Sequence, residues 1–277
     1  MSEVYFKIDE NFEPIIKKAL AGKEVKSMNL ITTGWTNIVY EVETNEGNYF
    51  FRFPRDEFWS RTIVKDSEFA GYIYQKTSFN TCQLELKRDE GRPFSVHKKI
   101  AGTPLAEKIE QLSEEEIAQI SADIAKFMAE LHQVNFQNEK IFTINDIGLN
   151  LSEFLDELLT KHVSQEDRAF WKFSDTVETP KCLVHGDLNL SNVLLDENNK
   201  VTAIIDFGFA GYGNIYDDVA RIISRNCPKN FKREIIRNYE KYAQTKLDEK
   251  KLEDKVIEWI NIDQGYINYM RGIGIYE

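Results

Sequence analysis

The sequence predicts an α+β fold in two parts, a strand-rich first third followed by a mostly helical remainder. Three observations support this prediction. Apolar residues alternate up to about residue 98, they recur at helical spacing after residue 102, and a β-hairpin interrupts the helical part at residues 193–205. We therefore expect one lobe at residues 1–98 and a second at residues 99–277.

The first lobe is predicted to be an antiparallel sheet flanked by two helices. An amphipathic helix is expected at residues 9–21, with Asp9 as its cap, and a second helix at residues 60–77. Turn-forming residues at 45–47 separate two runs of alternating apolar residues, which is typical of a hairpin. The five expected strands cover residues 25–33, 37–44, 48–53, 82–87 and 93–100.

The second lobe is predicted to be helical. Ser113 and Glu116 form a capping-box pattern, and apolar residues continue at helical spacing to Leu131, so we expect this helix in the core. The other expected helices are two short ones within residues 151–173 and two long ones at 229–245 and 249–269.

One cluster of polar residues surrounds the predicted hairpin at 193–205. Asp187 precedes Asn192 by five positions, and Asp206 follows the second strand. Phosphoryl transfer needs metal ions on the phosphates and a base at the attacking hydroxyl, and Mg²⁺ prefers oxygen ligands. Asn192 and Asp206 are therefore candidate Mg²⁺ ligands, and Asp187 is the candidate catalytic base. The alternative is that these residues only form turns and cap a strand.

The segment HGDLNLSN at 185–192, followed by IIDFG at 204–208, resembles the catalytic loop and metal loop of the aminoglycoside phosphotransferase and choline kinase family. These are protein-kinase-like small-molecule kinases, and Gly186 stands where protein kinases have Arg. The resemblance implies a bilobal protein-kinase-like fold, with an antiparallel five-stranded lobe and a helical lobe. It also implies ATP or GTP as phosphoryl donor and Mg²⁺ as cofactor.

The resemblance also indicates residues that contact the nucleotide phosphates. The turn TTGWTN offers Gly34, Thr36 and Asn37, although the GxGxxG pattern of protein kinases is absent; the alternative is a plain hairpin turn. Arg52 stands where the family has the basic residue that contacts the phosphates. Kinases usually have Lys there, so the planar guanidinium is expected to change the contact geometry.

A helix carboxylate and a hinge complete the nucleotide site that the resemblance implies. Glu68 is expected to form an ion pair with Arg52, and Asp66 is the alternative partner. The segment VHKKIAGTPL resembles the family's hinge, which implies that the backbones of His97 and Lys99 contact the adenine.

Toward the C-terminus the resemblance implies a residue that holds the catalytic loop and two that meet the acceptor. Asp218 is expected to hold the catalytic loop by hydrogen bonds, with Asp217 as the alternative, and His132 to brace the same loop. Trp259 and Asp263 are the candidate acceptor contacts, in a segment similar to the terminal helix of the aminoglycoside 2″-phosphotransferases. The alternative is that both serve helix packing and surface charge.

Composition restricts the partners. The chain has 277 residues, 42% of them hydrophobic, and a formal charge of -11. The negative charge argues against nucleic-acid and membrane partners and favours a small cationic substrate, although acidity for solubility alone is also common. The cysteines are three in number and lack CxxC spacing, and no secretory or membrane-spanning segment is evident, so we expect a cytoplasmic protein with reduced thiols. We expect a monomer.

The resemblance, together with the negative charge, implies a small-molecule kinase of the antibiotic-resistance type, with an aminoglycoside as the favoured acceptor. Choline, methylthioribose, macrolide and homoserine kinases share the same motifs and remain alternatives. A non-catalytic nucleotide-binding protein on a kinase scaffold is a second class of explanation. A protein kinase is disfavoured because no APE segment follows the DFG sequence.

Overall fold

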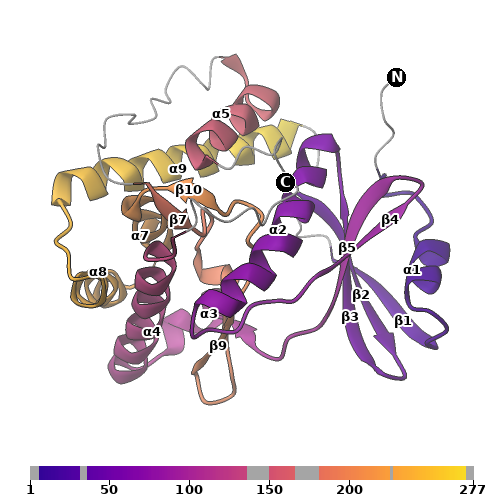
Figure 1. Cartoon of the computed structure of the whole chain (residues 1–277), viewed down its shortest axis with the longest axis horizontal. Coiled ribbons are helices and arrows are strands. Elements are labelled where there is room, and N and C mark those ends of the chain that lie inside the picture. The colour runs from indigo at the N-terminus through magenta and orange to yellow at the C-terminus, as the bar shows by residue number, and fades with distance from the viewer. Residues whose placement is uncertain (1–5, 32–35, 136–149, 166–180, 225–226, 273–277) are drawn as a thin grey trace.

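The computed structural model describes residues 6–31, 36–135, 150–165, 181–224 and 227–272. A sheet with one helix on its outer side forms one end of the molecule, and helices form the other end (Figure 1). The long helix α2 lies between the two parts, so the predicted α+β architecture in two lobes is confirmed.

The first lobe contains the predicted antiparallel sheet. Its strand order is β1-β2-β3-β5-β4, and every neighbouring pair is antiparallel. The tight turn predicted at 45–47 joins β2 to β3. The strands are β1 (Val25–Ile31), β2 (Asn37–Thr44), β3 (Gly47–Pro54), β4 (Glu85–Asp89) and β5 (Arg92–Lys98).

Helix α1 (Glu13–Ala19) packs against the outer face of this sheet (Figure 1). It begins later than predicted, and the prediction of Asp9 as its cap was wrong, because the N-cap position is Phe12 and carries no side-chain cap. The side chain of Asn11 instead accepts a hydrogen bond from the N–H of Glu13 at 3.1 Å.

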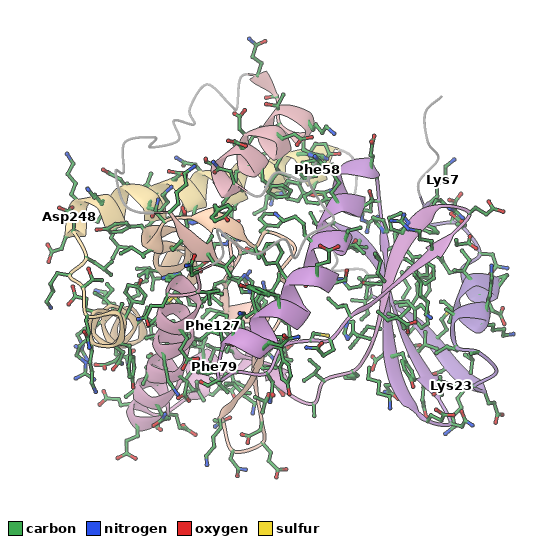
Figure 2. The ribbon with its side chains drawn as sticks, viewed as in Figure 1. Lys7, Lys23, Phe58, Phe79, Phe127 and Asp248 are labelled. Atoms are coloured by element: carbon green, nitrogen blue, oxygen red, sulfur yellow. The ribbon has the colours of Figure 1, made fainter. Side chains whose placement is uncertain are left out.

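Helix α2 (Glu57–Lys76) begins at Asp56, whose side chain accepts a hydrogen bond from the N–H of Trp59. Its buried aromatic residues pack on the second lobe. The rings of Phe58 and Phe154 are 5.0 Å apart, and Phe79, just beyond the helix, lies 5.6 Å from Phe127 (Figure 2). Although α2 follows the first three strands in the chain, it therefore belongs to the core of the helical lobe.

The second lobe is mostly helical, and the capping box predicted at Ser113 and Glu116 is present at the start of α4. One of the two short helices predicted within 151–173 is observed, and the remainder of that range after residue 165 lies outside the described residues. The helices are α3 (Leu105–Lys108), α4 (Glu114–His132), α5 (Leu151–His162), α7 (Ile215–Ser224), α8 (Lys229–Ala243) and α9 (Glu249–Gly272).

Two small sheets interrupt the helical lobe and carry the loops of interest. β8 (Val193–Leu195) and β9 (Val201–Ile204) form the predicted hairpin, and β6 (Thr103–Pro104) pairs with β8. β7 (Cys182–Val184) pairs with β10 (Gly211–Gly213). The loops that follow β7 and β9 are thereby held by sheet pairing on both sides.

The described residues form two separate apolar cores, one between α1 and the five-stranded sheet and one within the helical lobe together with α2. A division of the chain at residue 98 remains our proposal. Within the part of the chain that the structure describes, none of the helices has the length and apolar character needed to cross a lipid bilayer.

Candidate active site

A cleft of about 860 Å³ separates the sheet from the helical lobe. Glu68 is not among the described residues that line it, and Gly34 lies outside the described residues. The other predicted site residues line this one cleft: Thr36, Asn37, Arg52, His97, Lys99, Asp187, Asn192, Asp206, Trp259 and Asp263.

The candidate catalytic loop, residues 185–192, follows β7, and Asp218 on α7 holds it by hydrogen bonds. The carboxylate of Asp218 accepts hydrogen bonds from the backbone N–H groups of His185 at 2.8 Å and Gly186 at 2.9 Å. His132 on α4 lies 3.1 Å from the same carboxylate through Nε2. Asp217 instead contacts Lys255 at 3.1 Å, so the predicted roles of Asp218 and His132 are confirmed.

Asp218 is fully buried, and its charge is stabilised where it stands. Burial by itself raises the pKa of this carboxyl group, but the hydrogen bonds from His132 and from the backbone N–H of His185 outweigh it and lower the pKa below its ordinary value. The carboxylate therefore stays ionised and keeps the loop in place at neutral pH.

His185 joins the catalytic loop to the loop that carries Asp206. Its Nε2 lies 3.0 Å from the carbonyl oxygen of Ile205, and its Nδ1 accepts a hydrogen bond from the N–H of Asp187 at 3.3 Å. One proton on Nε2 satisfies both contacts, so the neutral imidazole fits this position. Asp187 and Asp206 are thus held relative to each other through one buried side chain.

Asn192 and Asp206 fit the oxygen ligands of a divalent ion. The amide nitrogen of Asn192 donates to the carbonyl of Asp187 at 2.9 Å, which leaves its amide oxygen for a ligand. The N–H of Ile205 donates to the carbonyl of Asn192 at 3.0 Å and so draws the two loops together. Asp206 has a left-handed backbone (φ 70°), and its side chain is 43% exposed. One carboxylate and one amide suit Mg²⁺, which takes its remaining ligands from phosphates and water.

Arg52 on β3 is paired with two carboxylates. It contacts Asp66 on α2 and lies 3.2 Å from Oδ1 of Asp206. Asp66 also accepts a hydrogen bond from the N–H of Phe207 at 2.8 Å. The ion pair predicted between Arg52 and Glu68 was therefore wrong, and Asp66, the alternative, takes that role.

The guanidinium of Arg52 stays protonated although it is buried. Burial lowers the pKa of a guanidinium, but the negative charges of Asp206 and Asp66 outweigh this effect and raise the pKa above its ordinary value. A permanent positive charge therefore stands beside the candidate metal ligand, where nucleotide phosphates would bind.

The predicted hinge lines the cleft at the end of β5. Burial lowers the pKa of His97 to about 4, so its imidazole is uncharged at neutral pH. The N–H of Lys99 already donates to the carbonyl of Asn48 at 2.8 Å. The nucleobase of a bound nucleotide would therefore have to share or replace that hydrogen bond. Before and at the start of β2, which also lines the cleft, the side-chain amide of Asn37 donates to the hydroxyl of Thr36 at 2.8 Å.

The far end of the cleft contains an arginine that the sequence reasoning missed. Arg221 on α7 contacts Oδ1 of Asp187 at 2.8 Å and Oδ2 of Asp263 at 2.8 Å, and its guanidinium lies 4.6 Å from the ring of Trp259. Trp259 is 1% exposed, and its indole N–H donates to the carbonyl of Asp217. Trp259 therefore supports Arg221, while Asp263 remains 19% exposed.

Arg221, like Arg52, stays charged because neighbouring carboxylates outweigh the effect of burial on its pKa. Burial works against the charged guanidinium, but Asp187 and Asp263 outweigh it and raise the pKa. A signal for Arg221 was present in the sequence, because a lone cation within the apolar run VARII indicates a buried, paired residue.

Homoserine kinase from Methylobacillus flagellatus is 25% identical over 215 residues, which make up 74% of this chain and 65% of that protein. The chain thus spans just under two thirds of that relative.

Solved structures share the fold. The GDP and kanamycin complex of APH(2″)-IIIa superposes with a TM-score of 0.66 at 20% identity, covering 95% of this chain and 93% of that one. The streptomycin–ATP–APH(2″)-IIa ternary complex gives a TM-score of 0.62 at 22% identity, covering 95% and 92%. The family model described as "Phosphotransferase enzyme family" matches residues 27–252, which is most of the sequence. The resemblance found in the motifs is therefore confirmed, and this chain belongs to the phosphotransferase enzyme family (APH).

Proposed function

We propose that this protein transfers the γ-phosphate of ATP or GTP to a hydroxyl group of a small molecule, with an aminoglycoside as the favoured acceptor. The observation that supports this most strongly is the single cleft lined by Asp187, Asn192, Asp206 and Arg52. A base, two metal-binding oxygens and a phosphate-binding cation are the groups that phosphoryl transfer requires.

The donor end of the cleft lies between β3 and the hairpin β8–β9. Arg52, held by its pairing with Asp66, would contact the phosphates, and Asn192 and Asp206 would hold Mg²⁺. When bound, Mg²⁺ neutralises phosphate charge and fixes the geometry of the phosphate oxygens. Relatives of the same fold are described with GDP and with ATP, which supports a nucleotide donor.

Asp187 would act on the acceptor. Its carboxylate accepts the proton of the acceptor hydroxyl while the hydroxyl oxygen bonds to the γ-phosphorus. The bond from the γ-phosphorus to the bridging oxygen breaks at the same time, and the nucleoside diphosphate leaves with that electron pair. Because the transition state is loose, the main task of Asp187 is to orient the hydroxyl.

An aminoglycoside suits the acceptor end because its ammonium groups would meet the carboxylates of Asp187 and Asp263. The formal charge of -11 would also attract a polycation. Two structures of the same fold are complexes with kanamycin and with streptomycin, which supports the same class of acceptor.

A hydroxylated amino acid is the second candidate. Arg221 and Asp263 lie side by side at 2.8 Å in the cleft, and such a pair can meet a carboxylate and an ammonium group on one small molecule. The partial match to a homoserine kinase favours the same chemistry.

The test is a transfer screen with labelled ATP and GTP and with Mg²⁺. Acceptors are kanamycin and streptomycin, homoserine, choline, methylthioribose and a macrolide, and the enzymes are the wild type and Asp187→Asn. We expect Mg²⁺-dependent labelling of an aminoglycoside by the wild type, lowered by about 10²–10⁴-fold in Asp187→Asn with nucleotide binding retained. Labelling of homoserine alone would favour the second candidate. Equal labelling by the wild type and Asp187→Asn would refute the assignment of Asp187 as the base.

A further inference from the structure

Arg221 connects the candidate base to the acceptor end of the cleft. Its Nε and Nη2 both lie 2.8 Å from Oδ1 of Asp187, and its Nη1 lies 2.8 Å from Oδ2 of Asp263. The side chain is 5% exposed, and the guanidinium lies over the ring of Trp259. One planar cation therefore joins side chains from the catalytic loop, α7 and α9.

The hydrogen bonds to the carboxylate of Asp187 all involve one of its two oxygens, Oδ1. Oδ1 accepts hydrogen bonds from Nε of Arg221 and from the side-chain amide of Asn189 at 3.1 Å, and it forms an ion pair with Nη2 of Arg221. Among the described residues no hydrogen bond is made to Oδ2 of Asp187, and this side chain lines the cleft with 23% of its surface exposed. A carboxylate with one oxygen held by two hydrogen bonds and an ion pair cannot rotate without losing them, so its other oxygen has a fixed direction.

We propose that Arg221 is the positioning residue of the phosphoryl transfer, holding Oδ1 of Asp187 so that Oδ2 accepts the proton of the acceptor hydroxyl. This rests on the proposed function of the same cleft. Arg221 also links the base to Asp263, so the residue that would meet an ammonium group and the residue that takes the proton are set by one guanidinium. A lysine cannot replace it, because an ammonium group lacks the planar fork that reaches both carboxylates.

Two variants separate positioning from binding. Arg221→Ala is expected to lower kcat of transfer by about 10²-fold with little change in nucleotide affinity, because the base is present but no longer oriented. Asp263→Asn is expected to raise KM for the acceptor more than it lowers kcat. In Arg221→Ala, millimolar guanidinium, far below unfolding concentrations, is expected to restore part of the rate.

The matched control is Arg92→Ala. Arg92 also pairs with two carboxylates, Glu10 at 2.9 Å and Asp89 at 3.1 Å, and lies 4.1 Å from the ring of Phe6. It is not among the residues of the cleft. Arg92→Ala is expected to lose stability without a change in kcat and without rescue by guanidinium.

A double-variant comparison makes the test independent of which acceptor is used. The slow Mg²⁺-dependent hydrolysis of ATP, with water as acceptor, and the transfer reaction are measured in Asp187→Asn, Arg221→Ala and the double variant. If Arg221 acts through Asp187, the double variant is no slower than Asp187→Asn alone, and guanidinium does not rescue it.

The outcomes are distinguishable. A normal rate in Arg221→Ala, full activity in Arg221→Lys, or additive losses in the double variant would overturn the positioning role while leaving the proposed function intact. Unchanged rates in Asp187→Asn would refute Asp187 as the base and this proposal with it, whereas the absence of transfer to every acceptor would overturn the proposed function. If Arg221→Ala does not fold, Arg221→Lys, which keeps the buried charge, is expected to bind ATP normally and to transfer slowly.

Discussion

At the scale of single residues, Gly186 has the least freedom in the catalytic loop. Its backbone is left-handed (φ 79°), and a Cβ atom placed there would lie 2.4 Å from the carbonyl oxygen of Phe209. The backbone of Phe209 would have to move, and with it the segment that follows Asp206. The glycine therefore fits a close approach of two loops that carry the candidate site carboxylates Asp187 and Asp206.

We expect Gly186→Ala to lower transfer by about 100-fold, because displacing the loop by about 1 Å misplaces the base. Kinetics of transfer and urea unfolding would measure the effect. Gly91→Ala is the control, since Gly91 has a similar φ of 88° but no atom within 4 Å of the position that a Cβ would take. Gly91→Ala should lose only stability, and normal transfer by Gly186→Ala would show that the loops adapt.

The residues of the site differ in how far the sequence could identify them. Asp187, Asn192 and Asp206 were found because they lie at fixed positions around one short hairpin, and that hairpin is confirmed. Asp66 was ranked below Glu68 because motif position does not give the phase of a helix. The phase was nevertheless readable, since Asp66 lies three positions from both Ile63 and Phe69 on the buried face of α2.

At the scale of elements, α2 has a buried cation that the mechanism does not use. Lys65 is 0% exposed, and its ammonium group lies 4.7 Å from the ring of Phe154 on α5. Burial, together with the charge of Arg61, lowers its pKa from 10.5 to about 7. The cation–π contact offsets only part of the cost of burying the charge.

This shift sets a pH dependence of stability. In the unfolded chain Lys65 titrates near 10.5, so between about pH 7 and 10.5 the unfolded state binds more protons and the free energy of unfolding rises with pH. We expect Lys65→Met to be more stable than the wild type by about 2 kcal/mol near pH 6.5, with a smaller difference near pH 9.5. Urea unfolding at both values measures this.

Lys76→Met is the matched control for Lys65→Met. Lys76 lies on the same helix at 5.3 Å from the ring of Tyr72, but it is exposed. Its replacement should change stability little and equally at both pH values. A constant or reversed difference for Lys65→Met would contradict the assigned cost of burial.

The ends of helices and strands could be predicted where neighbouring residues in the sequence mark them. The capping box gave the start of α4, and alternation gave β2. The strand predicted at 82–87 is instead β4 at Glu85–Asp89. The chain joins the sheet only at Glu85, because Thr81, just before this segment, pairs with Ile204 in the other lobe. Such a long-range contact has no signature in the local pattern.

At the scale of the whole molecule, the two lobes meet through Asp66. It pairs with Arg52 from the sheet and accepts the N–H of Phe207 from the helical lobe. The apolar face of α2 joins the core of the helical lobe, so the sheet is attached to a helix that belongs to the other part. The sequence predicted a helix at residues 60–77 in the first lobe, but helical spacing does not show which lobe covers its apolar face.

Asp187, Asn192 and Asp206 share one cleft, and we propose that Asp206 binds Mg²⁺ together with the nucleotide phosphates. This central claim is tested most directly by titrating a non-hydrolysable ATP analogue into the wild type, Asp206→Ala and Asp196→Ala, with and without Mg²⁺. Asp196 lies at the opposite end of the same hairpin, where it accepts the N–H groups of Asn198 and Lys200. We predict that Mg²⁺ tightens binding at least about tenfold, near 1.4 kcal/mol, in the wild type and Asp196→Ala but not in Asp206→Ala. An equal gain from Mg²⁺ in all three proteins would contradict the account.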